Sequence, residues 1–448
     1  MNKILTSLLV ASSAFAFAAC VGEQDDIFDK SAAERLNEVS EIYTNRLAAS
    51  QGGWLMEYYP TNDNERYTGE GYVMAMRFTS DNKVLVGMKN FVTFDEYKEC
   101  ESAWEVITDN GPVLSFNTYN DVLHTFSAPN DNPFTKGKYE DETGRGFEGD
   151  YEFVITNLDE DADRAMLKGK KRGTYNRITR LPAGTDFETI LTDIADFKTK
   201  MIPNRAHEIR LDVGGKTYSS LGMDTIPNIF PSDGDAVIDI NMVPYTIGKR
   251  GDKYTLRFHH AIGEGDDKEQ CFVYDESRNM FVGEENSANV VRGYNAAELP
   301  KFFVDVLDLK GWMPLTTDES SAEFVDLYKR AEEGFKAKSS LNTLQSIAIK
   351  NVGDKTHLIF TYKKSRTSGL TLKYIYGRTE TDKGVTLTYE KPLNSDATKM
   401  ADADGVQQLI EMFNGALTVT DADPRGLCVK SVKVTCANGV WFRTNYAF

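Results

Sequence analysis

Cysteine and histidine, which often act as nucleophiles or metal ligands, are scarce in this sequence. Five cysteines and five histidines occur among 448 residues. The motifs H-E-x-x-H, C-x-x-C and G-x-S-x-G, which mark zinc proteases, dithiol redox proteins and serine hydrolases, are all missing. Carboxylates are too numerous for any pair to be singled out as a general acid and base. The sequence therefore carries no signature of an enzyme.

Positive charge is also in short supply. Lysine and arginine number 51 against 68 aspartates and glutamates, which gives a formal net charge of −17. A field of that sign repels phosphate backbones, so we expect no nucleic acid among the partners. Beyond the first 20 residues, no run is long and apolar enough to span a bilayer.

The one long hydrophobic run, Ile4–Ala19, stands at the amino terminus behind a lysine. It is shorter than the roughly 20 apolar residues of a spanning helix and ends in small residues, which is typical of a secretory signal peptide at residues 1–19. Cys20 follows directly, so the segment resembles a bacterial lipoprotein signal whose cysteine becomes the first mature residue. Phe17 stands where such signals usually have leucine. The alternative is an ordinary cleaved signal followed by an incidental cysteine.

Acylation of Cys20 predicts a lipid anchor. Each buried CH₂ contributes about 0.8 kcal/mol, and a diacylglyceryl group with palmitate-type chains supplies more than the single chain that binds only marginally. Residues 20–30 form a polar tether that is acidic from Glu23 to Asp26. It resembles the export mark of Bacteroidetes lipoproteins, which predicts an outer-membrane protein on the cell surface. A merely solvated linker is the alternative.

Four further cysteines, at positions 100, 271, 428 and 436, allow three disulfide pairings in an exported protein. If Cys428 and Cys436 lie on one strand, eight residues at about 3.3 Å each separate them. That exceeds the roughly 7 Å limit between the Cα atoms of a disulfide, so this pair should not bond.

Local patterns predict short elements through the first half. Ser31 and Glu34 form a capping box for a helix at Ser31–Ser50, where apolar residues recur at helical spacing. From Trp54 to Leu181, β segments follow one another without helices between them, which favours antiparallel sheets. The expected fold class is mainly β with accessory helices (α+β), built as antiparallel sandwich or barrel-like sheets in two halves.

We place the main domain boundary near residue 203, after a second helix with Thr185 and Glu188 as its capping box. Strands then resume, interrupted by helical patterns. The expected domains are a helix plus an antiparallel β domain at 31–203 and a second β-rich domain at 204–448, with helices near 299–309, 321–338 and 405–414. Each half thus shares a loose pattern of one helix followed by strands.

The end of the chain gives two sharper expectations. Asp404 caps the helix at 405–414, and Gly415 ends it. Asn438 and Gly439 stand between two β-rich runs, which is the strongest short signal for a hairpin. The chain should therefore end in paired strands.

Two runs resemble ligand-binding motifs, but their surroundings disagree with that function. The glycine-rich run at 144–149 fits G-x-G-x-x-G, yet a strand pattern follows it instead of the helix that would hold a pyrophosphate. The aspartates at 159–163 lack the glycine and glutamate of a calcium loop. His259 and His260 are adjacent in a strand, so their side chains should leave opposite faces. We therefore expect no cofactor and no metal.

Aromatic side chains are the remaining candidates for ligand contact. Trp54, Tyr58 and Tyr59 form one group, and flat π-faces can stack on the apolar face of a sugar ring. We take these three as candidate binding residues. The alternative is that they are core residues of strands, as aromatic residues in alternating patterns usually are.

The segments GGWLMEYYP, GYVMAMRF, NGPVLSFNTYNDVLHTFSAP, GDYEFVI and LKGKK, in this order behind a lipoprotein signal, resemble the Bacteroidetes lipoprotein family of domain of unknown function 4302 (DUF4302). The resemblance implies a surface accessory protein near SusC/SusD-like uptake systems. The family has no established activity, so only Cys20 is carried over as a functional position.

These observations favour a non-catalytic outer-membrane lipoprotein that binds a glycan or peptide, with a SusC/SusD-like transporter as its partner. One alternative is a surface hydrolase with a family-specific site that uses His124 or clustered carboxylates. Another is a structural subunit of an envelope complex.

Overall fold

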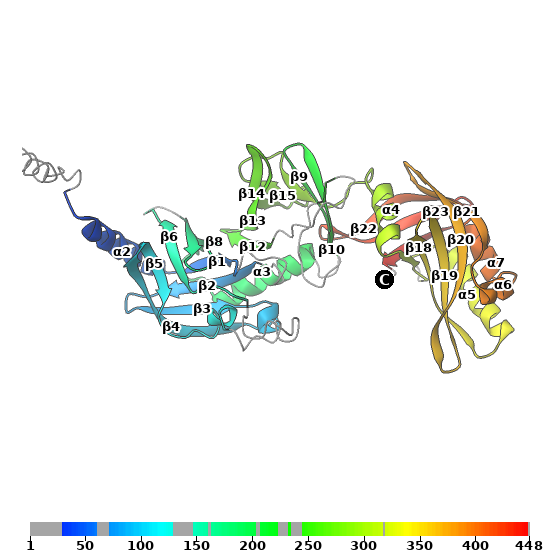
Figure 1. Ribbon diagram of the computed structural model, residues 1–448, viewed down its shortest axis with the longest axis horizontal. Coiled ribbons are helices and arrows are strands. Elements are labelled where there is room, and N and C mark those ends of the chain that lie inside the picture. The colour runs from blue at the N-terminus through cyan, green and yellow to red at the C-terminus, as the bar shows by residue number, and fades with distance from the viewer. Residues whose placement is uncertain are drawn as a thin grey trace, which may run out of the picture.

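The computed structural model describes residues 29–60, 71–128, 147–159, 163–202, 207–222, 232–233, 244–316 and 319–446. The chain is mostly β, with two closed eight-stranded barrels, one eight-stranded sheet and a few helices. The first barrel, the middle sheet and the second barrel follow one another along the long axis (Figure 1). The expected fold class is confirmed, and its strands form three sheets. The division into domains stays a prediction.

The first barrel is an up-and-down barrel, because each strand pairs antiparallel with the next and the last returns to the first. The 3₁₀ helices η1 (Phe91–Thr93) and η2 (His124–Phe126) lie in its connections. Its strands are β1 (Trp54–Tyr58), β2 (Tyr72–Phe78), β3 (Lys83–Met88), β4 (Lys98–Asp109), β5 (Gly111–Phe116), β6 (Glu152–Asn157), β7 (Arg164–Gly169) and β8 (Tyr175–Arg180).

Helix α2 (Ala32–Ala48) precedes this barrel. Ser31 is its N-cap, and the side chain of Glu34 accepts the Ser31 backbone N–H in return, so the predicted capping box is confirmed. The buried Leu47 near the end of α2 belongs to the same apolar cluster as the barrel interior. The helix is therefore part of the barrel's core.

The middle sheet follows helix α3 (Phe187–Met201). Asp186, not Thr185, caps this helix, because its carboxylate accepts the backbone N–H of Thr189 at 2.8 Å. The predicted capping box was therefore wrong by one residue. The strands are β9 (His207–Val213), β10 (Lys216–Gly222), β11 (Ser232–Asp233), β12 (Tyr245–Arg250), β13 (Lys253–Glu264), β14 (Asp267–Asp275), β15 (Met280–Gly283) and β16 (Val290–Arg292), in the order β11-β10-β9-β16-β15-β14-β13-β12.

One apolar cluster joins α3 to both neighbouring sheets. It contains Leu191 and Ile194 of α3, Leu256 and Phe258 of the middle sheet, and Leu55 on the outer face of the first barrel. The first barrel and the middle sheet therefore share a core, which fixes their relative position.

The second barrel begins after helix α4 (Leu299–Leu309). Three further helices lie between its strands: α5 (Ala322–Lys338), α6 (Ser395–Met400) and α7 (Val406–Met412). Its strands are β17 (Trp312–Pro314), β18 (Asn342–Val352), β19 (Lys355–Lys364), β20 (Thr367–Thr381), β21 (Gly384–Pro392), β22 (Gly415–Arg425), β23 (Cys428–Cys436) and β24 (Trp441–Tyr446).

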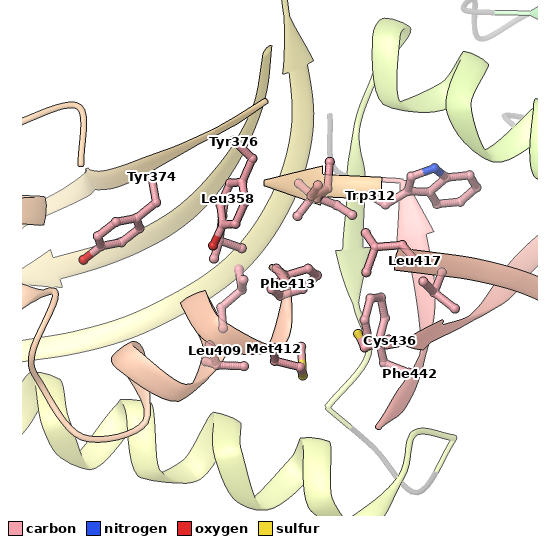
Figure 2. Close-up of a cluster of buried hydrophobic side chains, with 14 of the residues drawn as sticks. Trp312, Leu358, Tyr374, Tyr376, Leu409, Met412, Phe413, Leu417, Cys436 and Phe442 are labelled. Carbon is pink, nitrogen blue, oxygen red and sulfur yellow. The ribbon is translucent and has the colours of Figure 1, made fainter. Parts of the chain in front are cut away.

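Helices α6 and α7 pack on residues of this barrel's own core. The hydroxyls of Tyr374 and Tyr376 on β20 donate to the carbonyls of Ala397 in α6 and Ile410 in α7, at 3.0 and 2.9 Å. Figure 2 shows Tyr376 facing the helical segment that carries Leu409, Met412 and Phe413. The core of the second barrel is thus completed by helices inserted between its strands.

Three local expectations near the end of the chain have different outcomes. The Asn438–Gly439 hairpin is confirmed, since β23 pairs with β24 around it. Cys428 and Cys436 lie at the two ends of the single strand β23, as their spacing predicts. The predicted cap of α7 was wrong: Gly405 precedes the helix, while the carboxylate of Asp404 pairs with Arg330. Across the described residues, no helix has both the length and the apolar character to cross a membrane.

Candidate functional site

The predicted lipidation residue, Cys20, lies outside the described residues, as does the tether up to residue 28. Of the glycine-rich run at 144–149, only the last three residues are described, and strand β6 follows them. Most of the aspartate run at 159–163 is also outside the described residues.

The three aromatic candidates are fully buried. The Trp54 indole N–H donates to the Leu47 carbonyl at 3.0 Å. The Tyr58 hydroxyl donates to the Asp150 carbonyl at 3.0 Å, inside the first barrel. These two rings are therefore core residues whose polar atoms are satisfied, which agrees with the alternative interpretation given above for aromatic residues in strands. They offer no face to a ligand from solution.

Tyr59 is buried on the other side of the barrel wall, against the middle sheet. Its hydroxyl donates to the Arg257 carbonyl at 2.7 Å, and its ring stacks on His259 at 4.6 Å between centroids. Burial raises the pKa of the Tyr59 hydroxyl, and Glu57 nearby adds to the rise while Arg257 opposes it. Tyr59 thus helps to seal the contact between the two sheets.

Beside Tyr59 lies a buried ionic network made of Glu57, Arg177, Thr246, Arg257 and Cys271. Arg177 Nε lies 2.5 Å from a Glu57 carboxylate oxygen, and Thr246 Oγ1 donates to the other at 3.0 Å. Arg177 also donates to the sulfur of Cys271 at 3.2 Å. Burial by itself would raise the pKa of Glu57, but the two arginines hold that pKa below its usual value. The network therefore keeps a buried carboxylate ionised between the first barrel and the middle sheet.

This network is best understood as a structural clamp. Its residues come from β1 and β8 of the first barrel and from β12, β13 and β14 of the middle sheet. Buried ion pairs contribute little net stability because desolvation offsets their attraction, but a buried charge without its partner is strongly destabilising. The pairing therefore favours one docking geometry of the two sheets over others.

A concave site of about 1290 Å³ lies beside α3 at the middle sheet, and we call it the groove. Helix α3 and the β12–β13 and β14–β15 turns form its walls. Its lining includes Asp193, Asp196, Phe197, Tyr254, Tyr274 and Glu276. Its volume exceeds the range of about 300 to 1000 Å³ typical of small-molecule pockets, which suits an extended ligand.

The floor of the groove is aromatic. The rings of Phe197 and Tyr254 stack with 3.6 Å between centroids and 4° between planes, and Tyr274 meets Phe197 edge-on at 5.0 Å. Phe197 is nearly buried, whereas the two tyrosines are half-buried and contribute exposed ring area. Apolar area of this kind matches the C–H face of a sugar or an aliphatic side chain.

The wall of α3 is polar and mostly acidic. Asp193 accepts a hydrogen bond from the Tyr254 hydroxyl at 2.6 Å and an ion-pair contact from Lys249 at 2.5 Å. Burial opposes ionisation of Asp193, but these two donors keep its pKa below the usual value. Asp196 and Glu276 are exposed nearby. Carboxylates fixed beside aromatic rings can accept hydrogen bonds from ligand hydroxyls or ammonium groups.

Sequence reasoning placed Tyr254 and Tyr274 in strands but did not select them. A signal was present, since each lies two residues from a fully buried residue of its strand, Leu256 and Phe272. Because side chains alternate along a strand, each tyrosine continues an inward-facing row at the strand's end. Which rows end beside α3 depends on the packing of that helix.

Two of the histidines, His259 and His260, lie side by side on β13. His259 and His260 were expected on opposite faces, but their ring centroids are 4.2 Å apart, because the register of β13 shifts between Arg257 and Ile262. Burial, with His260 and Arg257 nearby, lowers the pKa of His259 to about 3. In the part of the chain that the structure covers, no three His, Cys, Asp or Glu side chains gather closely enough to hold a metal.

His124, named for the hydrolase alternative, lies between two tyrosine rings. Its centroid is 5.0 Å from that of Tyr119 and 4.9 Å from that of Tyr151. Its Nδ1 accepts the backbone N–H of Asn120 at 3.0 Å, and burial lowers its pKa. The ring is therefore held neutral as part of a local stack.

Comparison with known proteins gives one family model and solved structures that are only distantly similar. Residues 24–228 match the family model described as domain of unknown function (DUF4302). No curated protein matches the sequence.

Solved structures give only weak matches. The structure of intact Ap-TbpB, with its N and C lobes, has 7% identity and a TM-score of 0.14, over 87% of this chain and 74% of that one. A double mutant of the vaccine antigen transferrin binding protein B from Haemophilus parasuis Hp5 has 6% identity and a TM-score of 0.13, over 87% and 73%. At these TM-scores neither match supports a statement about function.

Proposed function

Residues 24–228 of this chain belong to the family of domain of unknown function DUF4302, and from that premise we propose that the protein is a lipid-anchored surface protein that binds a glycan in the groove. The family description assigns no activity, so the site has to be argued from its own chemistry. The observation that carries the proposal is the aromatic floor of Tyr254 and Tyr274 beside the carboxylates of α3, in a groove of about 1290 Å³.

A glycan fits this combination of groups better than a compact ligand does. Sugar rings present C–H faces to aromatic side chains and hydroxyls to carboxylates, and a chain of several sugars fills an open, elongated site. Acylation at Cys20 would hold the groove at the cell surface, where a SusC/SusD-like transporter is the proposed partner. The protein's task is then capture of the glycan and not its cleavage.

Isothermal titration of the mature chain carrying Cys20→Ser against soluble polysaccharides and peptides tests the ligand. We expect a glycan to bind, and Tyr274→Ala to weaken it about tenfold through lost ring contact. Tyr175→Ala is the matched control, because Tyr175 is exposed on the first barrel away from the groove. Binding of peptides alone, or equal loss in both variants, would contradict the proposal.

Fractionation of cells that express the full chain tests the anchor separately. We expect the protein in the outer membrane with an acylated Cys20, digestible by protease added outside the cell. Cys20→Ser should release it from membranes washed in 0.5 M NaCl, because the acyl chains supply the binding free energy that salt does not weaken. A variant that stays membrane-bound would refute the lipid anchor while leaving the groove untouched.

A further inference from the structure

The second barrel differs in charge from the rest of the chain. Residues 1–298 contain 31 lysines and arginines against 50 aspartates and glutamates, whereas residues 299–448 contain 20 against 18. The negative charge of the protein is thus carried by the first barrel, the middle sheet and the segments around them. Any attraction to an anionic surface has to be sought at the other end of the molecule.

Strand β20 extends past its neighbour β21 at one end of the second barrel, whereas β18 accompanies β19 as far as the pair of Asn342 with Lys364. Lys364 pairs with Thr367 at the turn, whereas the last residue of β21, Pro392, already lies opposite Tyr374. The hairpin therefore continues beyond β21, and Figure 1 shows it projecting from the barrel. Its turn is the outermost part of this end.

Basic side chains gather at this projecting turn. Lys363, Lys364 and Arg366 are exposed on the hairpin, and Lys336 is exposed in the last turn of α5. That turn reaches the same end, since the ring of Phe335 lies 5.3 Å from that of Tyr362. Over the residues that the structure covers, none of the four basic side chains forms an ion pair.

An exposed leucine completes the group, which we call the basic tip: Leu341 together with Lys336, Lys363, Lys364 and Arg366. Leu341 is 56% exposed. Its carbonyl accepts the backbone N–H of Ser365 at 3.2 Å, which places it directly against the turn. An exposed apolar side chain in the same turn as basic ones can enter the headgroup region of a bilayer while the basic groups contact phosphates.

Ordinary structural reasons account for only part of the basic tip. Lys336 stands near the carboxyl end of α5, where a positive charge is favoured by the helix dipole. The three basic residues of the hairpin are not part of a helix, so the dipole of a helix does not explain their positions. Leu341 also remains exposed, although the apolar core of the barrel lies close by.

We propose that the basic tip docks on an anionic lipid surface, with Leu341 entering the interface and the four basic side chains contacting phosphates. A projecting turn reaches a flat membrane readily, whereas a typical protein interface needs about 800 Å² on each partner. The acidic residues of the first barrel and middle sheet repel a membrane at the basic tip only weakly, because the Debye length is about 10 Å in 0.1 M salt. The contact acts in addition to the anchor on Cys20 and does not depend on the groove.

Co-sedimentation with vesicles tests the proposal directly. The mature chain with Cys20→Ser is mixed with vesicles of equal phosphatidylglycerol and phosphatidylcholine in 0.1 M NaCl. We expect binding that falls in 0.5 M NaCl and is lost on pure phosphatidylcholine. Replacing Lys363, Lys364 and Arg366 by glutamine should lower the partition coefficient about 100-fold, and Leu341→Ser should lower it about fivefold.

The matched control changes the same net charge at the opposite end of the same strands, with Lys350→Gln, Lys355→Gln and Lys383→Gln together. It should bind vesicles like the parent chain, and thermal melting of each variant verifies that it is folded. Failure of the parent chain to bind anionic vesicles would overturn the proposal. Equal loss in both triple variants would do the same, as would binding of polyglutamate at the tip without binding of vesicles.

Discussion

The two barrels begin in the same way, although they share no obvious sequence repeat. In each, a helix is followed by a fully buried tryptophan on the first strand, and the indole N–H donates back to a carbonyl of that helix. Trp54 donates to Leu47 at 3.0 Å, and Trp312 donates to Phe303 at 2.9 Å. One short segment therefore fixes the entry of the chain into each barrel.

The connection between helix and strand is also alike. Gly53 and Gly311, each directly before the tryptophan, have φ of 81° and 82°. A Cβ at Gly53 would lie 2.4 Å from the Met76 carbonyl oxygen, and one at Gly311 would lie 2.6 Å from that of Ile349. Both the backbone conformation and the close approach of a neighbouring strand require glycine at these positions.

The surroundings of the two barrels differ. The first barrel shares an apolar cluster and the buried ionic network with the middle sheet, so both faces of β1 are covered. The second barrel contributes only Leu427 and Cys428 to that cluster, and the backbone N–H of Leu427 donates to the Met201 carbonyl at 2.8 Å. The same local start therefore serves both a barrel built into a larger body and a barrel with a largely separate core.

Replacing either tryptophan by alanine should give the largest change in stability. Trp54→Ala and Trp312→Ala should each destabilise their own barrel by about 3 to 5 kcal/mol, because a large buried side chain is lost. We expect scanning calorimetry to show two transitions, each variant lowering a different one. If both variants lowered the same transition equally, the cores would not be separate.

The ionic network gives the next largest effect. Glu57→Gln leaves two arginines buried without their carboxylate, which should cost about 3 kcal/mol or more in the transition of the first barrel and middle sheet. Glu264→Gln is the control, because its pair with Lys216 is solvent-exposed and should give no measurable change. A similar shift in both variants would show that the network is not a clamp.

The glycine before Trp312 separates strain from crowding. Gly311→Ala combines an unfavourable φ with a steric clash, so it should lower the free energy of unfolding of the second barrel by about 2 to 3 kcal/mol. Gly353→Ala is the matched control, since its φ is 60° but nothing lies within 4 Å of the added Cβ, so about 1 kcal/mol is expected. Denaturant unfolding measures both, and equal costs would mean that crowding at Gly311 is relieved.

Histidine titration should distinguish the two parts by pH. Burial lowers the pKa of His124, His259 and His260 in the first barrel and middle sheet, but only that of His357 in the second barrel. A histidine with a lowered folded pKa stabilises fully above its unfolded pKa near 6.5, and that contribution is lost as the pH falls.

For His259 the loss continues down to a pH of about 3, with a slope of up to about 1.4 kcal/mol per pH unit. The melting temperature of the first barrel and middle sheet should therefore fall more steeply between pH 7.5 and 5 than that of the second barrel. His259→Gln should make this fall less steep. Parallel slopes for the two transitions would contradict this assignment.

Much of the local structure could be predicted from the sequence because it depends on neighbouring residues. Ser31 with Glu34 and the Asn438–Gly439 turn specify their elements through contacts within a few positions. The same reasoning missed the start of α3 by one residue, since Thr185 and Asp186 are both good caps and only the structure shows which one binds Thr189.

The candidate site was less accessible to such reasoning. Trp54, Tyr58 and Tyr59 looked suited to ligand contact, yet all three are buried, because the interior of the barrel covers one face of β1 and the middle sheet covers the other. Tyr254 and Tyr274 line the groove only because α3 packs beside the ends of their strands. Periodicity shows which residues share a face but not what lies against that face.

The sequence by itself determined the strands, the main turns, the approximate positions of the helices and the acidic character of the protein, since each depends on composition or on residues close together in the chain. Only the tertiary structure decided that the strands close into two barrels around a middle sheet, that the groove lies at α3 and that the basic tip stands apart from the acidic remainder. The physical reason is that strand register, barrel closure and the meeting of sheet faces come from contacts between distant segments, whose free energies no local pattern encodes.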